Sequence, residues 1–385
     1  MLNVIQDHLN LIWAFIVCCI LNTAIFIFPI PVFYLPDLLL LAYLIYKFPD
    51  LNQEISPLFF LGLILLVGFF ILSPEPPDSE FTNNYLVALK PFFYICVLAA
   101  YSKNIPNIEI IRGVRIFLVI YPLILLWNLF LVHLKENAGL AQLMSTRPFF
   151  IFENNFEITF YLNCFCIAFF IYKEQDWKKF ALLVLVIILA GSRSGLLSFA
   201  VICIFYFFAV SWKQKITVAI LAMLTTFYIA KGRNIGAPIG TIDRVQSLQA
   251  ILTHYNSNLM EILSTPFGFG IYEKVPRYIC IKLPDFAEWF TGNSHNCDPL
   301  MLQAFYTRAL FQFGIYITLS IPFIFLAITK KETGLKLAVI ILAPITCVAT
   351  SVGGFSNGLA FWGILISVFA YLQYQQTIAL KQNLI

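Results

Sequence analysis

Long apolar runs separated by short charged connections are the feature that most constrains how this chain can fold. A helix that crosses a membrane needs about 20 predominantly apolar residues, and only helices or closed barrels satisfy every backbone polar group inside lipid. By that measure we expect about twelve transmembrane helices, near residues 11–29, 31–46, 57–73, 84–101, 114–133, 156–172, 178–190, 195–211, 215–230, 301–328, 335–352 and 358–376. The sequence therefore predicts an all-α polytopic membrane protein.

The composition agrees with this class and argues against two others. Charged residues make up 11% of the chain, whereas a soluble domain carries roughly 25%. The net charge of +4 is small and the basic residues lie at the ends of spans, so nucleic-acid binding is not expected. The first apolar run has neither a basic segment before it nor a small-residue cleavage site after it. We therefore expect the first span to be retained rather than removed as a signal peptide.

Basic residues sort between alternate connections of the predicted bundle. One set of connections holds thirteen of them: Lys47, Lys103, Arg112, Arg115, Lys173, Lys178, Lys179, Lys213, Lys215, Lys330, Lys331, Lys336 and Lys381. The short connections of the other set hold only Lys135, Arg147 and Arg193. Because short cytoplasmic loops are enriched in Lys and Arg, we expect the first set and both termini in the cytoplasm.

One long stretch, residues 231–300, interrupts the apolar pattern. It carries twelve charges that cancel and two of the four histidines. The sorting of the basic residues places this loop on the external face, and a large polar loop on one face of a membrane protein is where chemistry is expected. We expect a single integral membrane domain, residues 1–385, in which 231–300 forms an external loop with amphipathic helices that acts as a lid over the site.

The cysteines fall into two groups. Seven of the nine lie in apolar spans, where they act as small hydrophobic residues. The other two, Cys280 and Cys297, lie in the polar loop. An oxidising compartment would preserve a disulfide between them, and two free thiols are the alternative.

The segment Gly191-Ser192-Arg193-Ser194-Gly195 joins two apolar helices on the expected external side. An arginine at a membrane boundary often extends to the lipid headgroups, and that is the simple interpretation of Arg193. The flanking glycines and serines leave the backbone uncovered, however, and Ser194 is able to cap the helix that follows. A helix N-terminus beside a guanidinium group suits an anion, phosphate in particular. We therefore expect an anion site at Arg193.

An amphipathic helix is expected at residues 243–252 in the polar loop. Apolar residues recur there at helical spacing, so the helix should lie on the membrane surface with Arg244 in its first turn. Considered alone, Arg244 is a solvated surface residue. The glycine-rich turn at 266–270 (Pro-Phe-Gly-Phe-Gly) lacks a phosphate-loop lysine and is weak evidence for a site.

The polar loop ends in a histidine-containing segment, residues 294–299 (Ser-His-Asn-Cys-Asp-Pro). Asp298 followed by Pro299 predicts a helix start, with Asp298 as the cap and Pro299 at the first helical position. His295 then lies just outside a helix N-terminus on the external face. A lone loop histidine is more often structural than catalytic. The ordinary pKa of a histidine, about 6.5, nevertheless suits proton transfer at neutral pH.

Several other polar residues on the external side are secondary candidates for the site. Lys90 lies well inside an expected span. A charge at that depth is either functional or extends outward along its own stem, and both interpretations stay open. The remaining secondary candidates are Arg147, Glu153, Asn296 and Arg308.

Several well-known catalytic motifs are missing from the sequence. There is no Asp-x-Asp pair, no His-x-x-x-His pair, no phosphate-binding loop and no Gly-x-Ser-x-Gly elbow. We therefore expect neither a metal nor a cofactor, and cationic side chains would have to stabilise any anion.

The order of these motifs resembles that of the O-antigen ligase/polymerase superfamily, membrane proteins that polymerise or ligate undecaprenyl-diphosphate-linked glycans. The likeness covers roughly residues 180–330, with Gly-Ser-Arg-Ser-Gly at a span junction, Asp-Arg opening an amphipathic helix and His-Asn leading into a span. It extends to the expected topology of many spans with one large late periplasmic loop.

The resemblance implies a GT-C-like fold in a bacterial inner membrane, and metal-independent, inverting glycosyl transfer at the periplasmic face. Arg193 and Arg244 match the family's arginines that hold the lipid diphosphate, and His295 matches the histidine that activates the acceptor hydroxyl. Cys297-Asp298-Pro299 departs from the Leu/Tyr-rich run usual in ligases. That departure favours an O-antigen polymerase of lipopolysaccharide biosynthesis, with a lipid-linked glycan donor and acceptor and a chain-length regulator protein as partners.

Three other functions stay open at this point. An O-antigen ligase would transfer the glycan to lipid A-core. A transporter or flippase for a lipid-linked glycan would be expected to show paired broken helices and ionisable residues near mid-membrane. A metal-dependent glycosyltransferase using a lipid monophosphate would require Asp37 or the acidic turn at 73–80 to bind a divalent ion.

Overall fold

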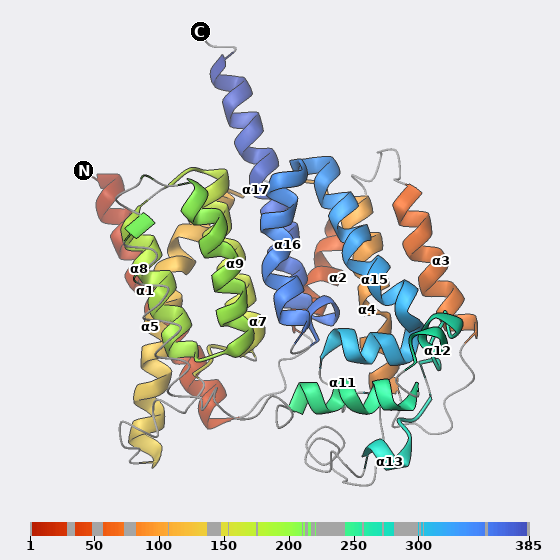
Figure 1. The fold of residues 1–385 in the computed structure, drawn as a ribbon. Helices are drawn as coiled ribbons and strands as arrows, with labels where there is room; N and C mark the ends of the chain where they lie inside the picture. Colours follow the sequence, from red (N-terminus) through yellow and green to blue (C-terminus); the bar gives the residue numbers. More distant parts are fainter. Residues whose placement is uncertain are drawn as a thin grey trace.

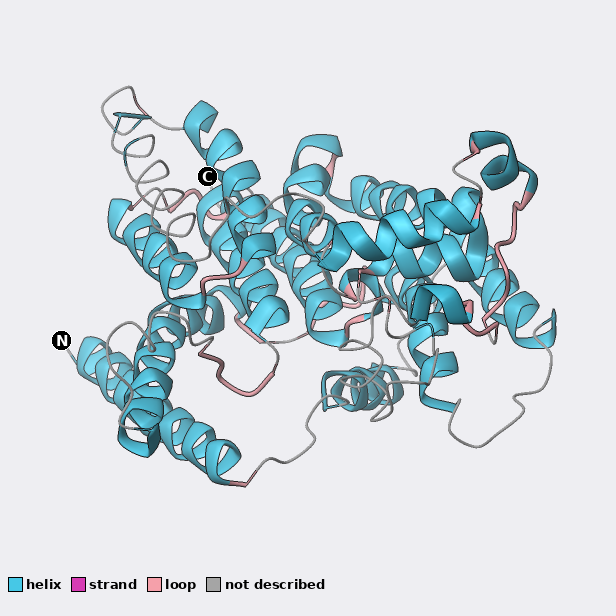
Figure 2. Ribbon diagram, turned by 60° about the horizontal axis from the view of Figure 1, so that its bottom comes forward, coloured by secondary structure: helices cyan, strands magenta, loops and turns pink. Residues whose placement is uncertain are grey.

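A computed structural model describes most of the chain. The described residues are 2–28, 35–47, 57–72, 82–106, 108–136, 148–152, 154–174, 176–209, 211, 215, 216, 220, 243–255, 258–271, 273–280, 299, 302, 304–350 and 353–382. Within them all regular structure is helical, as Figure 2 shows. The expected all-α architecture is therefore confirmed for this part of the chain.

Long helices form a bundle, and shorter ones lie across one of its ends (Figure 1). The bundle helices are α1 (Leu2–Ile27), α2 (Leu35–Lys47), α3 (Pro57–Leu72), α4 (Thr82–Tyr101), α5 (Ile110–Glu136), α7 (Asn154–Cys166) with its π-helical extension η3 (Ile167–Ile171), α8 (Trp177–Ala190), α9 (Arg193–Ala209), α15 (Phe305–Thr333), α16 (Leu335–Ala349) and α17 (Gly358–Gln382). The shorter helices are α11 (Asp243–His254), α12 (Leu259–Ser264), α13 (Arg277–Cys280) and the 3-10 turn η6 (Gly354–Ser356).

Three helices of the described part are long and apolar enough to cross a membrane, namely Ile110–Lys135, Phe305–Thr333 and Gly358–Gln382. Helices also occupy eleven of the twelve segments expected to be spans, and the other one, 215–230, lies mostly outside the described residues. The structure thus agrees with a helical membrane protein. The number of twelve spans stays a prediction.

The buried core consists of two groups of helices that share α16 and α17. One group packs side chains of α5, α7, α8 and α9 together, and the other packs α2, α4 and α15. Residues of α16 and α17 contribute to both cores. Figure 1 shows this arrangement, with α16 and α17 in the middle of the bundle.

Large apolar side chains also cover the outside of the bundle. Phe208 is 78% exposed, and Ile64 and Phe323 are each 67% exposed. Soluble monomers rarely expose extended apolar patches of this kind, whereas lipid is a favourable environment for them.

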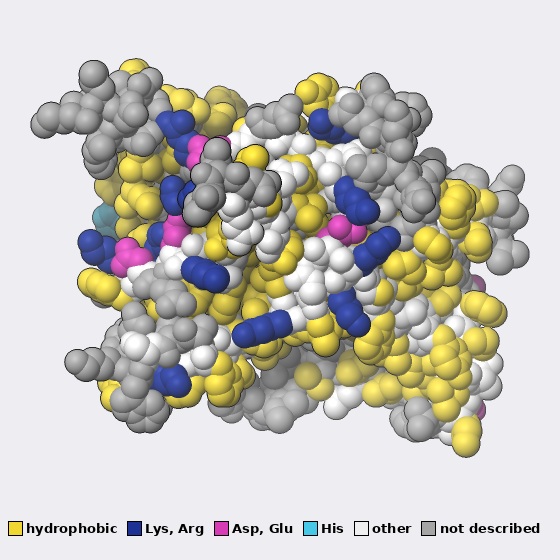
Figure 3. Space-filling view, turned by 90° about the horizontal axis from the view of Figure 1, so that it is seen from above, with side chains coloured by type: hydrophobic (Ala, Val, Ile, Leu, Met, Phe, Trp, Pro, Cys, Tyr) yellow, Lys and Arg dark blue, Asp and Glu magenta, His cyan; other side chains and the backbone are white. Residues whose placement is uncertain are grey.

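Basic side chains gather at the end of the bundle where the two chain ends lie (Figures 1 and 3). Helices α2, α15 and α17 finish there with Lys47, Lys330, Lys331 and Lys381. These four belong to the thirteen basic residues that the positive-inside rule predicts to be cytoplasmic. We refer to this end as the basic end and to the opposite one as the outer end.

The outer end carries the polar loop. Helix α11 lies across it (Figure 1) and buries Ile251 while Leu248 stays 39% exposed. The amphipathic helix expected at 243–252 is therefore present. Together with α12, α13 and part of α15, it encloses a small apolar core of its own.

Helix α15 differs from the expectation in two respects. Pro299 lies in a 3-10 turn, in which its carbonyl accepts the N–H of Leu302 at 3.0 Å, and α15 itself begins only at Phe305, after Ala304 in an extended conformation. It is also broken at Gly314, where φ is 75° and ψ is 174°, so a short first half precedes the longer second half. An aspartate followed by a proline is a local signal, and here the first half of α15 is positioned by contacts with the distant loop instead.

Candidate functional site

The junction between α8 and α9 is built as a sharp helix-to-helix turn at the outer end. Gly191 adopts a left-handed conformation with φ 56°, which glycine tolerates without strain, and its N–H donates to the carbonyl of Ile187 at 3.1 Å. Ser192 then caps α9, because its hydroxyl accepts the N–H of Gly195 at 3.1 Å. The expected cap, Ser194, lies instead within the first turn, so that prediction is wrong by two residues.

Asn155, at the start of α7, holds this junction in place. Its Oδ1 accepts the hydroxyl of Ser192 at 2.5 Å and that of Ser194 at 3.3 Å. All three side chains are buried. The N-terminus of α9, where Arg193 is the first helical residue, is therefore fixed against α7. The side chain of Arg193 lies outside the described residues.

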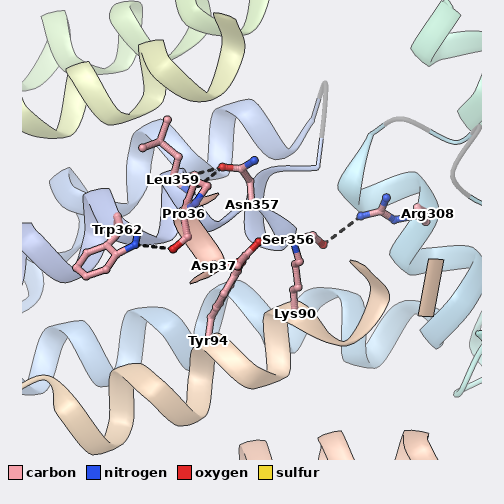
Figure 4. A network of polar contacts seen from close by, with 10 residues as sticks. Pro36, Asp37, Lys90, Tyr94, Arg308, Ser356, Asn357, Leu359 and Trp362 are labelled. Carbon is pink, nitrogen blue, oxygen red and sulfur yellow. Dashed lines mark hydrogen bonds and ion pairs between the residues drawn. The ribbon is translucent and has the colours of Figure 1, made fainter. Parts of the chain in front are cut away.

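A second cationic residue, Arg308, reaches the same region from the first half of α15. It is only 5% exposed, and its Nη2 donates to the hydroxyl of Ser356 in η6 at 3.1 Å (Figure 4). A Cβ added to Gly353 would lie 3.9 Å from Arg308 Nη2 and 3.9 Å from the ring of Phe156. Arg308 and the first turn of α7, the element that holds the start of α9, thus both lie close to Gly353.

Lys90, in α4, approaches η6 from the other side and is held by a carboxylate. Its Nζ lies 2.6 Å from Oδ2 of Asp37 at the start of α2 (Figure 4). The hydroxyl of Tyr94, one turn further along α4, donates to Oδ1 of the same carboxylate. Both charged side chains are mostly buried, at 17% and 21% exposure. Lys90 therefore pairs within the protein rather than extending to the headgroups.

The start of α2 is locked against the start of α17. The indole of Trp362 donates to the carbonyl of Pro36 at 2.9 Å, and a Cβ on Gly358 would lie 2.7 Å from Asp37 Oδ1. Asn357 caps α17 by accepting the N–H groups of the second and third residues of the helix. The loop between α16 and α17 therefore lies between two polar contacts: Arg308 binds its Ser356, and Asp37, the partner of Lys90, lies against Gly358 at its end.

We define the outer polar cluster as Asp37, Lys90, Asn155, Ser192, Ser194, Arg308 and Ser356. It lies at the outer end and draws its members from six segments: α2, α4, α7, the α8–α9 junction, α15 and η6. Asp37 is the member that sequence reasoning missed as a partner of Lys90. The available signal was that a lysine inside one apolar span calls for an opposite charge inside another.

The Asp37–Lys90 pair leads to a stability prediction. Asp37→Asn removes the carboxylate charge beside a mostly buried ammonium group, and we expect it to cost about 2–3 kcal/mol. Lys90→Met alone should cost a similar amount, because it leaves the carboxylate without its cation. The double variant should lose less than the sum of the two single losses, by a coupling energy of about 1–2 kcal/mol. Thermal unfolding of the four purified proteins in detergent measures this, and strictly additive losses would contradict the pairing.

The loop histidine that the structure describes, His254, belongs to an aromatic cluster of α11, α13 and the 266–270 turn. Its Nδ1 lies 2.7 Å from the hydroxyl of Tyr278, and its ring centroid lies 4.6 Å from that of Phe269. Burial lowers the pKa of His254 and outweighs the opposing effect of the Glu273 carboxylate. His254 is therefore expected to be neutral at neutral pH and to have a packing role.

Cys280 is buried and disulfide-bonded, whereas Cys18, Cys19, Cys96, Cys164, Cys166, Cys203 and Cys347 are free. Its expected partner, Cys297, lies outside the described residues. A disulfide in the polar loop agrees with an external location, because oxidising compartments preserve such bonds.

We expect the denatured protein to react with maleimide at seven thiols without reductant and at nine after reduction, from the seven free cysteines plus the loop pair. Mass spectrometry of the labelled chain measures this. Nine labelled thiols without reduction would contradict the disulfide, and Cys280→Ser is the control that removes one partner.

Four expected site residues lie outside the described residues altogether: Arg147, Glu153, His295 and Asn296. Arg244 is the second residue of α11, and its side chain is likewise outside the described part. The start of α9 and the whole of α11 lie at the same end of the bundle (Figure 1). The structure thus places Arg308 beside η6 and Lys90 beside Asp37, and it shows only the helix positions of Arg193 and Arg244.

One buried acid was not singled out from the sequence. Glu157, in the first turn of α7, is 3% exposed and accepts the backbone N–H groups of Phe150, Ile151 and Phe152 at 2.8, 2.6 and 2.7 Å. The Tyr121 hydroxyl lies 3.3 Å from its Oε2. Glu157 therefore shapes the connection that precedes α7 at the outer end. A glutamate in an apolar segment was the signal for it.

Comparison with protein-family models, with curated proteins and with solved structures finds no match to this chain. The functional conclusion therefore depends on the motifs and on the geometry of the outer end.

Proposed function

We propose that this chain is a membrane glycosyltransferase that polymerises undecaprenyl-diphosphate-linked oligosaccharide repeat units at the periplasmic face. The reaction is metal-independent and inverting. The proposal combines the resemblance of residues 180–330 to the O-antigen ligase/polymerase superfamily with the arrangement of the outer end. In this account the basic end faces the cytoplasm of a bacterial inner membrane.

The observation that carries the proposal is the concentration of cationic groups and helix N-termini around the outer polar cluster. Arg308 donates to Ser356 in η6, Lys90 pairs with Asp37, and Asn155 holds the capped start of α9. Arg193 opens α9, and Arg244 lies in the first turn of α11 at the same end. Guanidinium groups and helix N-termini are suited to a diphosphate.

The proposed reaction gives roles to Arg193, Arg244 and His295. The acceptor hydroxyl attacks the anomeric carbon of the donor sugar, the bond from that carbon to the diphosphate oxygen breaks, and undecaprenyl diphosphate leaves with the bonding electrons. Arg193 and Arg244 stabilise the negative charge that develops on the leaving diphosphate. His295 accepts the proton of the attacking hydroxyl.

The contacts of Asp37 favour this function over the metal-dependent alternative. That alternative needs Asp37 or the acidic turn at 73–80 as a ligand. Both oxygens of the Asp37 carboxylate are engaged, one by Lys90 and the other by Tyr94. An ammonium partner competes with a divalent cation for the same oxygen, so Asp37 is poorly suited as a metal ligand. The acidic turn lies outside the described residues.

A gel of lipopolysaccharide from a deletion strain tests the proposal. Loss of a polymerase should leave lipopolysaccharide with at most one repeat unit, and the plasmid-borne gene should restore the ladder. Bare core with polymer stranded on undecaprenyl diphosphate would instead identify a ligase. An unchanged ladder would contradict both activities, and accumulation of the lipid-linked unit on the cytoplasmic side would favour a flippase.

A further inference from the structure

Two glycines far apart in the sequence meet backbone to backbone at the outer end. Gly268, in the 266–270 turn, and Gly314, at the break in α15, both have positive φ, 65° and 75°. A Cβ on Gly268 would lie 2.5 Å from the carbonyl oxygen of Phe311 and 2.6 Å from the nitrogen of Gly314. A Cβ on Gly314 would collide with the carbonyl of Pro266 and lie 2.7 Å from the nitrogen of Gly268. Neither position therefore has room for a side chain.

The polar loop caps the first half of α15 at this contact. The last carbonyls of a helix have no partner within it, and the break at Gly314 creates such an end. The N–H groups of Phe269 and Gly270 donate to the carbonyls of Phe311 and Gln312 at 2.8 and 3.1 Å. The Tyr255 hydroxyl, from the end of α11, lies 3.4 Å from the next carbonyl, that of Leu310. Three successive carbonyls of the half-helix thus accept hydrogen bonds from the loop.

The same short half-helix carries Arg308 towards η6. On one face of this half-helix, Phe305, Ala309 and Phe313 pack into the core of the bundle. Phe311 packs into the loop's own core, with its ring centroid 5.2 Å from that of Phe269. The half-helix is therefore held between bundle and loop, and a change in the loop contact acts on the segment that positions Arg308.

We infer that Gly268 and Gly314 are positioning residues: their contact docks the polar loop onto the first half of α15 and thereby sets the position of Arg308 at the outer polar cluster. The effect on transfer rests on the proposed function, whereas the mechanical coupling does not.

Hydrogen exchange of the full-length protein in detergent tests the coupling without any substrate. In Gly268→Ala we expect amide exchange to rise about tenfold in residues 266–271 and also in 305–313, because a strained and crowded contact opens more often. Gly314→Ala should give the same pattern. Tyr255→Phe removes only a hydroxyl and is expected to give a rise of about threefold in 305–313, which keeps the test available if the glycine variants fold poorly.

Two other glycines are matched controls. Gly270 and Gly334 also have positive φ, 98° and 79°, but a Cβ at either position meets no atom within 4 Å. Gly334→Ala, at the connection of α15 to α16, introduces similar strain and should leave exchange in 305–313 unchanged. Gly270→Ala lies in the same turn and should raise it less than Gly268→Ala does. Wild-type exchange in 305–313 of Gly268→Ala would overturn the coupling.

A double-variant measurement tests the role in transfer. If Gly268 acts through Arg308, then Gly268→Ala combined with Arg308→Ala should extend glycans no more slowly than Arg308→Ala alone. Losses that multiply would overturn the positioning role. A wild-type protein that shows the exchange coupling but extends no glycan would contradict the proposed function and still support the coupling.

Discussion

Arg193→Ala is expected to lower glycan extension by about 10²–10³-fold, the loss typical when one group that stabilises developing charge is removed. Arg193 opens α9 at a start that Ser192 caps and Asn155 holds, so the helix itself should persist without the guanidinium. The variant should therefore insert normally and lose activity. Lipopolysaccharide ladders from a complemented deletion strain, together with the membrane level of the protein, measure both properties.

Two further substitutions sharpen this prediction. Arg193→Lys keeps the charge but loses the fork of donors that matches a phosphate, so it should recover only part of the activity. Lys135→Ala removes another basic residue expected on the outer side, one that lies 5.0 Å from the ring of Phe26 and is exposed. This control should leave the ladder intact. A near-normal ladder from Arg193→Ala would remove Arg193 from the site.

Glu157→Ala is expected to destabilise the protein by about 4 kcal/mol. The substitution leaves the N–H groups of Phe150, Ile151 and Phe152 without the acceptor that now binds them, and each unpaired group costs about 1–3 kcal/mol. It also opens space beside the Tyr121 hydroxyl. We expect the unfolding temperature of the purified protein to fall by roughly 8 °C.

Glu157→Gln separates the hydrogen bonds from the bulk of the side chain. Its single carbonyl oxygen can still accept the N–H groups of Ile151 and Phe152, which now bind Oε1, but its amide nitrogen cannot accept the N–H of Phe150. We expect roughly half the loss seen for alanine. Equal unfolding temperatures for wild type, Gln and Ala would show that Glu157 does not organise this connection.

Hydropathy predicted the bundle well because span length and apolar content are local properties of the sequence. Helices lie at eleven of the twelve expected positions, and α11 occupies the expected amphipathic segment. The exact ends of the helices were harder to predict from the sequence. Ser192 rather than Ser194 caps α9, and Pro299 lies in a 3-10 turn that precedes α15 instead of opening it. A cap depends on which serine faces the helix start, and tertiary contacts decide that choice.

Only part of the candidate site could be predicted from the sequence, because its contacts join segments that are far apart in the chain. Lys90 and Arg308 were secondary candidates, but nothing local shows that Asp37 holds one and Ser356 the other. The 266–270 turn was weak evidence for a ligand site. Its glycine has a packing role instead, since Gly268 leaves room for the backbone of Gly314. Such close approaches cannot be read from a single glycine in a sequence.

The function proposed for this protein is to join glycans carried on a lipid diphosphate without a metal ion. Its most direct test uses the purified protein in vesicles with an undecaprenyl-diphosphate-linked repeat unit as both donor and acceptor, in the presence of EDTA. We predict a ladder of extended lipid-linked products, with inverted configuration at each new linkage, that Arg193→Ala does not form. No extension by the folded wild-type protein, or extension that EDTA abolishes and Mg²⁺ restores, would contradict the account.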